Sequence, residues 1–545
     1  MAIDAFTGPF VTHEVTNQVP PVGDVDLFST NVPLVEGLER EGGSWARDLL
    51  VEVGRAWGAE CTQTWGRQAN EFPPKLLTHD RYGNRIDEVE FHPAYHMLMQ
   101  QASEHELHAL PWNNPDENGH VARAAMYMCS GQADAGHGCP ITMTFAAVPA
   151  LRHAPSLYEE WVPRLTAASY DPVLGAEKAS AKCGMAMTEK QGGSDVRANT
   201  TTARPVGDDE YLLTGHKWFC SAPMCDLFLV LAKTDEGVSC FAVPRVLPDG
   251  SRNPFRLQRL KDKLGNKSNA SSEVEFDSTW GRLVGEAGRG VPTIIEMVAH
   301  TRLDCVIGSA CGMRAGVAAA TWHTAHRAAF GRTLVDQPLM QNVLADLCVE
   351  SEAATALALR LARAYDEEDT AFKRLATAIG KYWVCKRLPG HAFEAMECHG
   401  GNGYVEESGM PRLYREAPLN SIWEGAGNVN ALDVLRALVK QPEALDRYLA
   451  ELGEASGADP RLDAFVNGLK DDFADAATLE VRARLVVERL ALALQGSLLV
   501  RHAPAAVADA FCASRLAGDG GLAYGTLPAA TDFRAIIERH TPQPA

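Results

Sequence analysis

The feature that most constrains the fold is a change of residue pattern near Cys183. Before it and again after Gly290, apolar residues recur at three-to-four spacing, which is typical of amphipathic helices. Between them lie short β-branched and aromatic runs separated by Gly, Pro, Asn and Asp, the pattern of strands and turns. Strand and helix do not alternate along the chain, which argues against a doubly wound α/β sheet. We expect a mainly α-helical protein with a central β-barrel or sandwich.

This order predicts four segments. The boundaries we assign are 1–180 for an N-terminal arm and helical domain, 181–285 for a β-barrel domain, 286–440 for a helical-bundle domain and 441–545 for a further C-terminal helical domain. The first 45 residues or so lack a sustained period and contain many Pro, Val and Asn residues. They predict an extended arm that lies on its own domain or on a neighbouring subunit.

Composition narrows the class of protein. The chain has 545 residues, 46% of them hydrophobic and 22% charged, which is ordinary for globular proteins and excludes a disordered chain. The net charge of −19 argues weakly against a protein that coats nucleic acid with its whole surface. We see no secretory signal and no membrane span, and thirteen scattered cysteines suit a reducing compartment, so we expect a cytoplasmic location without membrane contact.

Several catalytic motifs are absent from the sequence. There is no P-loop, no G-x-S-x-G nucleophile elbow and no H-E-x-x-H zinc motif, and we predict no metal site. The glycine-rich run Gly400-Gly401-Asn402-Gly403 follows a helical pattern instead of a strand, which argues against a Rossmann phosphate loop. It fits a helix C-cap and turn, and equally a backbone contact to a cofactor.

Two segments carry candidate binding chemistry at the start of the strand region. The loop MAMTEKQGGSDVRANT, residues 185–200, combines glycines with hydroxyl groups, so its backbone N–H groups can approach a phosphate or a flavin carbonyl, although an ordinary β-turn fits as well. The following KWFCS run places Trp218 where it either stacks on a flat cofactor or fills the barrel core.

A candidate general base lies in the segment NSIWEGAGNVN. Glu424 stands between Trp423 and Gly425 in an apolar, glycine-containing loop. Desolvation there would raise the pKa of its carboxyl group into a range useful for proton abstraction. The alternative is an acidic residue that interacts with the dipole of the next helix.

Taken together, these segments resemble the acyl-CoA dehydrogenase superfamily of flavoproteins. The resemblance rests on four signatures in the family order, MTEKQGGSDV, HRAAFG, ECHGGNGYVEES and IWEGAGN. The N-terminal arm, the fourth domain (C-terminal and helical) and the runs FHPAYHMLMQ, CPITMTFAA and RLKDKLGNKSNASSEVEF are most similar to the AidB branch, the alkylation-response flavoproteins.

The resemblance implies FAD bound between the β-domain and the helical bundle, with Glu424 as the catalytic base that removes the α-proton of a thioester while flavin N5 accepts the β-hydride. Ser194 and Arg302 are expected to contact the substrate. The implied cofactor contacts are Met185, Met187, Thr188, Gly193, Ser194, Trp218, Phe219, Ser221, Arg327, Phe330, Gly400, Gly401, Ile422, Trp423 and Asn428. Of these, Arg327, Phe330, Gly400 and Gly401 are expected to touch the cofactor of a neighbouring subunit in a homotetramer.

The resemblance also leaves two functions open. One is an FAD-dependent oxidoreductase with weak acyl-CoA dehydrogenase activity and a role in the response to DNA alkylation. The other is a protective flavoprotein that binds double-stranded DNA through its C-terminal domain without significant acyl-CoA turnover. Arg436 and Arg515 are the candidate DNA contacts, although residues 437–545 carry 11 basic and 15 acidic residues.

Overall fold

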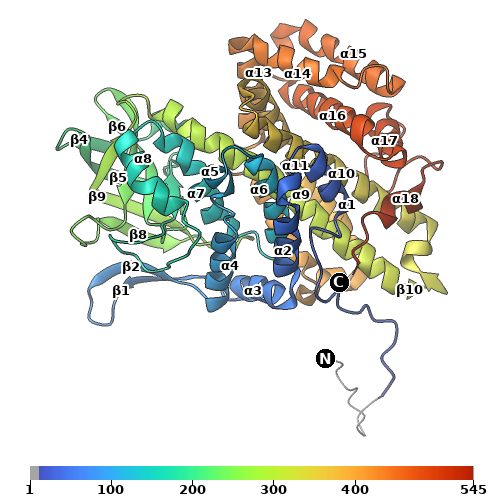
Figure 1. Cartoon of the computed structure of the whole chain (residues 1–545), viewed down its shortest axis with the longest axis horizontal. Helices are drawn as coiled ribbons and strands as arrows, with labels where there is room; N and C mark the ends of the chain where they lie inside the picture. The colour runs from blue at the N-terminus through green and yellow to red at the C-terminus, as the bar shows by residue number, and fades with distance from the viewer. Residues whose placement is uncertain (1–11, 544–545) are drawn as a thin grey trace.

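The computed structural model describes residues 12–543, so the ends of the chain lie outside the described residues. In Figure 1 the β-sheet lies at one end of the molecule, long helices occupy the middle, and the last helices cover the opposite end. The expected arrangement of a central strand region between helical regions is confirmed.

The N-terminal region is helical, with one exception. Its helices are α1 (Val32–Arg40), α2 (Arg47–Gly58), α3 (Glu60–Glu71), α4 (Pro93–Glu104), α5 (Leu110–Asn113), α6 (Gly119–Ser130), α7 (Gly138–Leu151) and α8 (Pro155–Leu165). The exception is an antiparallel hairpin, β1 (Lys75–His79) and β2 (Arg85–Glu90), where the sequence pattern predicted helix. The Asp80 carboxylate accepts hydrogen bonds from the backbone N–H groups of Tyr82 and Asn84, which favours a turn over a helix.

The strand region forms a closed sheet. Its strands are β3 (Cys183–Ala186), β4 (Thr202–Pro205), β5 (Glu210–Ser221), β6 (Leu227–Thr234), β7 (Gly237–Pro244), β8 (Phe255–Leu260) and β9 (Ser271–Val284). The pairings run β6-β4-β5-β9-β7 and return to β6, with β3 and β8 attached, so the ring closes as a small barrel. Apolar side chains on β6 and β7 are almost continuously buried, and they build the barrel core.

The bundle consists of α9 (Gly290–His326), the short strands β10 (Ala328–Ala329) and β11 (Arg332–Thr333), α10 (Pro338–Asp366), α11 (Thr370–Glu397), α12 (Met410–Glu416) and α13 (Gly427–Lys440). Helix α9 is long and apolar enough to span a membrane by length and composition, but 72% of its most apolar window is buried inside the molecule. It is the central helix of the largest hydrophobic cluster. A buried bidentate ion pair, Arg123 with Asp304 at 2.6 and 2.7 Å, joins α6 to α9.

The last helices are α14 (Pro442–Gly453), α15 (Pro460–Ala474), α16 (Ala483–His502), α17 (Ala505–Phe511) and α18 (Phe533–Glu538). They share the hydrophobic cluster of the bundle, so this part of the chain packs directly on α10 and α11. The Trp383 indole N–H donates to Gln495 Oε1 at 3.0 Å across that contact.

The arm follows the surface of the chain's own bundle. Asn17 exchanges hydrogen bonds with the backbone of Ala328, at 2.9 and 2.8 Å, and the Trp322 indole N–H donates to the carbonyl of Pro20 at 2.9 Å. From residue 12 the predicted arm has no helix or strand until α1 begins at Val32, with a turn at 27–30, and it docks on the end of α9.

Candidate functional site

Glu424 lies in a tight turn between the bundle helices. Its backbone has φ +56°, the left-handed region that residues with a Cβ adopt rarely, and Gly425 follows at φ +93°. The Glu424 Oε2 atom accepts a hydrogen bond of 2.6 Å from the hydroxyl of Thr301 on α9. The Arg302 Nε–H donates to the backbone carbonyl of Glu424 at 3.0 Å.

The surroundings of this carboxylate alter its acidity. Burial raises the pKa of Glu424 and outweighs the Thr301 hydrogen bond and the charges of Lys381 and Arg302, which act in the opposite direction. Glu424 as a whole residue is nevertheless partly exposed. A carboxylate of raised pKa in such a residue has the properties of a general base.

The loop after β3 is built around a buried acid that the sequence analysis did not single out. Glu189 is buried, forms an ion pair of 2.9 Å with Lys217 on β5, and accepts hydrogen bonds from the backbone N–H groups of Thr200 and Thr201 at 2.6 and 3.1 Å. The backbone N–H of Trp218 donates to the backbone carbonyl of Thr188 at 2.8 Å, so the loop is fixed against β5. A Cβ on Gly193 would collide with Thr188, which explains the glycine there.

Some of the predicted cofactor residues pack against the core of the β-domain. Met185, Met187 and Trp423 are partly buried and pack against the same hydrophobic cluster. Trp218 is partly exposed, with the ammonium of Lys261 3.2 Å from its ring centre. The Ser221 hydroxyl lies 3.0 Å from that of Ser271.

These groups fit a flavin. Flat aromatic rings, polarisable thioethers and the hydroxyl groups of Thr188 and Ser221 suit a large planar ring with polar edges. Phe219, Ser194, Ile422 and Asn428 are exposed, and Asn428 accepts a hydrogen bond of 2.8 Å from Arg484. Their cofactor roles stay predictions.

A second group of predicted residues occupies a different surface. Phe330 is 97% exposed with φ +53°, and the turn that begins at Gly400 is also exposed. The two turns are linked because the rings of His323 and His399 lie 4.5 Å apart in a tilted arrangement. His323 stands four residues before Arg327, and His399 directly precedes Gly400. Among residues 12–543, no hydrogen bond or salt bridge connects this surface to Glu424. The predicted contact with a neighbouring subunit's cofactor stays a prediction.

Three predicted arginines are placed by internal carboxylates. Arg302 pairs with Asp433 at 2.8 Å in addition to its bond to Glu424, so both ends of its guanidinium are engaged. Arg515 pairs with Asp346 and Glu350 and has only 16% of its side chain exposed. Arg436 is 58% exposed, with Asp433 at 3.6 Å. Their proposed substrate and DNA contacts remain predictions, and Arg515 has little surface available for one.

Two residues beside Glu424 were missed as functional candidates. They are Thr301 on α9 and Lys381 on α11, and the sequence motifs predicted neither of them. The available signal for Lys381 was a lone cation within the apolar run AIGKYWV of α11. Such a residue is almost never fully buried without a partner.

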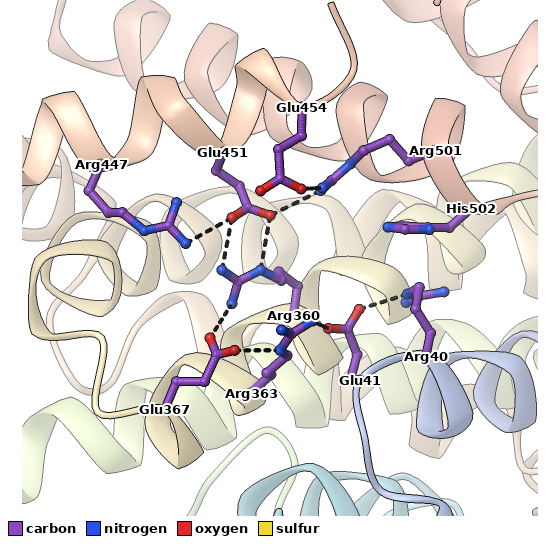
Figure 2. A pocket seen from close by; sticks show the side chains of 10 residues that line it. All are labelled: Arg40, Glu41, Arg360, Arg363, Glu367, Arg447, Glu451, Glu454, Arg501 and His502. Atoms are coloured by element: carbon purple, nitrogen blue, oxygen red, sulfur yellow. Dashed lines mark hydrogen bonds and ion pairs between the residues drawn. The ribbon is translucent and has the colours of Figure 1, made fainter.

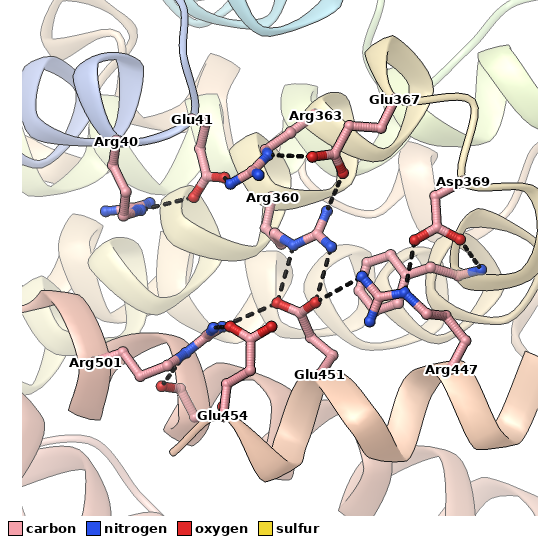
Figure 3. Close-up of polar contacts among 12 residues, drawn as sticks. Arg40, Glu41, Arg360, Arg363, Glu367, Asp369, Arg447, Glu451, Glu454 and Arg501 are labelled. Carbon is pink, nitrogen blue, oxygen red and sulfur yellow. Dashed lines mark hydrogen bonds and ion pairs between the residues drawn. The ribbon is translucent and has the colours of Figure 1, made fainter.

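A cavity lies away from Glu424, between α10 and the C-terminal helices. It has a volume of about 220 Å³ and is lined mainly by charged side chains (Figure 2), which are Arg40, Glu41, Arg360, Arg363, Glu367, Arg447, Glu451, Glu454, Arg501 and His502. Glu451 lies at its centre, bound by Arg360 at 3.0 and 2.8 Å and by Arg447 and Arg501 at 3.1 and 2.9 Å (Figure 3). Burial would raise the pKa of Glu451, but Arg360 and Arg501 lower it to about 2. The cavity walls are therefore an ion-pair cluster that joins α14 and α16 to α10.

Comparisons with known proteins cover almost the whole chain. Residues 17–172 match the model of the adaptive response protein AidB N-terminal domain, and residues 184–279 and 288–439 match the middle and C-terminal domains of acyl-CoA dehydrogenases. The chain is 44% identical to AidB of Escherichia coli (strain K12) over 519 residues, which is 94% of this chain and 96% of that protein.

Solved structures agree in fold. The Caenorhabditis elegans ACDH-11 structure in complex with C11-CoA is 26% identical and aligns with a TM-score of 0.84 over 93% of this chain and 94% of that chain. An acyl-CoA dehydrogenase from Bacillus anthracis complexed with FAD is 19% identical and aligns with a TM-score of 0.59 over 78% of this chain and 77% of that one.

Proposed function

The chain belongs to the acyl-CoA dehydrogenase family and to its AidB-type members, and we propose that Glu424 is the base with which it oxidises an acyl-CoA. The protein is an FAD-dependent oxidoreductase of the acyl-CoA dehydrogenase type.

The proposed chemistry breaks two C–H bonds of the thioester. The Glu424 carboxylate takes the α-proton, the electrons of that bond form the Cα=Cβ double bond, and the β-hydrogen leaves as a hydride. FAD, when bound, supplies the hydride acceptor. Thr301 donates to the ionised carboxylate, and Trp423 beside it limits the access of water to the reacting carbons.

The environment of Glu424 is the main support for this proposal. Burial raises its pKa, it is still partly exposed, and it lies in the turn next to Trp423, which shares a hydrophobic cluster with Met185 and Met187. An acidic residue that only interacted with the dipole of α13 would not need a hydrogen bond from α9 or a left-handed backbone.

Anaerobic titration with straight and branched acyl-CoAs of several lengths tests the proposal. We expect the flavin absorbance to bleach in the parent protein with at least one acyl-CoA, slowly if the activity is weak. Glu424→Gln should bind flavin and acyl-CoA but not bleach. Flavin that stays oxidised with every chain length would contradict the proposal.

We propose a second role, in the response to DNA alkylation, on the likeness to the adaptive response protein AidB. DNA contact is then best assigned to Arg436 and Arg484, which are exposed, in preference to Arg515, which is held by Asp346 and Glu350. Replacing both exposed arginines by Glu should abolish retention of double-stranded DNA at physiological salt, and a parent protein without retention would refute this role.

We also propose a homotetramer in the cytoplasm. Exposed Phe330, Leu339 and Tyr404, at 97%, 85% and 82%, are unusual on a monomer surface and suit burial by other subunits. Twelve of the thirteen cysteines are buried free thiols, which suits a reducing compartment. Sedimentation of the purified protein as a monomer would contradict the tetramer.

A further inference from the structure

The turn that carries Glu424 is held by donors from two helices. Lys381 on α11 donates from Nζ to the carbonyls of Trp423 and Gly425, at 2.7 and 2.5 Å. Arg302 on α9 donates from Nε to the carbonyl between them, that of Glu424, at 3.0 Å. Three consecutive carbonyls of one turn therefore accept hydrogen bonds from two cationic side chains.

This turn needs such support. Glu424 has a left-handed backbone, which is unfavourable for a residue with a Cβ and persists only where the surrounding structure enforces it. Gly425 extends the left-handed stretch, and its carbonyl also accepts from Asn430. Without the donors, the backbone would relax and redirect the Glu424 side chain.

Lys381 itself is unusual because it is only 1% exposed and, among residues 12–543, forms no salt bridge with a carboxylate. Its ammonium group donates hydrogen bonds to the carbonyls of Trp423 and Gly425 in the turn. The titratable groups that feel its charge are Glu424 in the turn, Cys305 on α9, and Cys385 and Lys386 on α11. The hydrogen bonds of this buried ammonium therefore stabilise the conformation of the turn.

Arg302 is anchored at its other end. Its Nη1 donates to Asp433 on α13 at 2.8 Å, and Asp433 also binds Arg374 on α11 at 2.9 and 3.2 Å. The support of the turn thus extends to three helices, and Lys381 contributes two of the four side-chain hydrogen bonds to the carbonyls of Trp423, Glu424 and Gly425.

We propose that Lys381 is a positioning residue, which holds the Trp423–Gly425 turn so that the Glu424 carboxylate faces the substrate and stays hydrogen-bonded to Thr301. The proposal rests on the proposed role of Glu424 as the base. It adds that a residue without any contact to the reacting atoms determines how effective that base is.

Lys381→Met tests this directly, because Met fills a similar volume and cannot donate. A displaced base loses rate at saturating substrate, so we expect kcat to fall roughly tenfold to a hundredfold while KM changes little. The loss of a nearby positive charge also raises the pKa of Glu424, so the acid limb of the pH–rate profile should move to higher pH. Lys373→Met on the same helix, where the ammonium lies 5.3 Å from the Tyr365 ring centre, is the matched control and should match the parent.

A second variant separates hydrogen bonding from charge and serves if Lys381→Met does not fold. Lys381→Gln keeps donors for the carbonyls but has no charge, so it should recover much of kcat and still show the shifted acid limb. Flavin content and thermal melting, recorded for each variant, identify loss of folding. An unchanged kcat and an unchanged acid limb in a folded Lys381 variant would overturn the proposal.

Glu424→Gln, measured in parallel, distinguishes the two hypotheses. If Glu424→Gln is inactive and both Lys381 variants match the parent, the base is correct and the positioning role is wrong. If Glu424→Gln remains active, the assignment of the base is wrong, and the positioning role falls with it.

Discussion

Thr301 offers the sharpest test of how the protein tunes its base. Its hydroxyl donates to Glu424 Oε2 at 2.6 Å and is almost fully buried, at 2% exposure for the residue. A hydrogen bond to a charged group contributes about 1.5–3 kcal/mol. Because one pKa unit corresponds to about 1.36 kcal/mol, Thr301→Val should raise the pKa of Glu424 by roughly one to two units.

Thr301→Val should shift the loss of activity to higher pH, because the ionised carboxylate of Glu424 is the active form of the base. The bond favours the carboxylate, so its loss favours the protonated carboxyl, and activity should disappear at a higher pH than in the parent. Well above the new pKa, the rate should return close to that of the parent, because Val keeps the shape of Thr.

The assay is the rate of anaerobic flavin reduction by a saturating acyl-CoA as a function of pH. Thr301→Ser keeps the hydroxyl and is the control, with its acid limb expected near that of the parent. The reasoning is refuted if the acid limb of Thr301→Val coincides with that of the parent, or if Thr301→Ser shifts as far as Thr301→Val.

Two further predictions concern stability and cofactor binding. Glu451→Gln leaves Arg360 and Arg501 without their central carboxylate. Because removing one partner of a buried ion pair costs about 3–5 kcal/mol, the free energy of unfolding measured with denaturant should fall by that amount. An unchanged unfolding midpoint would show that the ion-pair cluster does not stabilise the C-terminal helices. Gly193→Ala places a Cβ against Thr188 and should lower the bound flavin per protein while the far-UV spectrum stays unchanged. Gly390→Ala is the control, because its new Cβ meets nothing within 4 Å and Gly390 lies within helix α11. Full flavin content in Gly193→Ala would contradict the close packing of this loop.

Much of the fold was predictable because hydrophobic periodicity is local. The change of pattern near Cys183 located the strand region, and the closed ring β6-β4-β5-β9-β7 confirms the barrel. The β1–β2 hairpin was missed, since its turn depends on how the Asp80 side chain bonds to the backbone. Periodicity does not report such side-chain contacts.

The candidate site was predictable only in part. The apolar, glycine-containing surroundings of Glu424 predicted a carboxyl group of raised pKa, and burial in the structure does raise it. The cofactor contacts that the family signatures imply stay predictions. The role of Lys381 was not, because it acts on backbone carbonyls 42 and 44 residues further along the chain, which carry no sequence signal. Arg515 was expected on a DNA-binding surface, but it pairs with the buried carboxylates of Asp346 and Glu350. The sequence does not show this pairing.

Exchange of the α-proton of a bound acyl-CoA in D₂O, followed by mass spectrometry under anaerobic conditions, would show whether Glu424 is the base. It isolates the proton transfer from the later hydride step. We expect deuterium in the α position with the parent protein and none above background with Glu424→Gln at equal flavin content. Equal incorporation by both proteins would contradict Glu424 as the base.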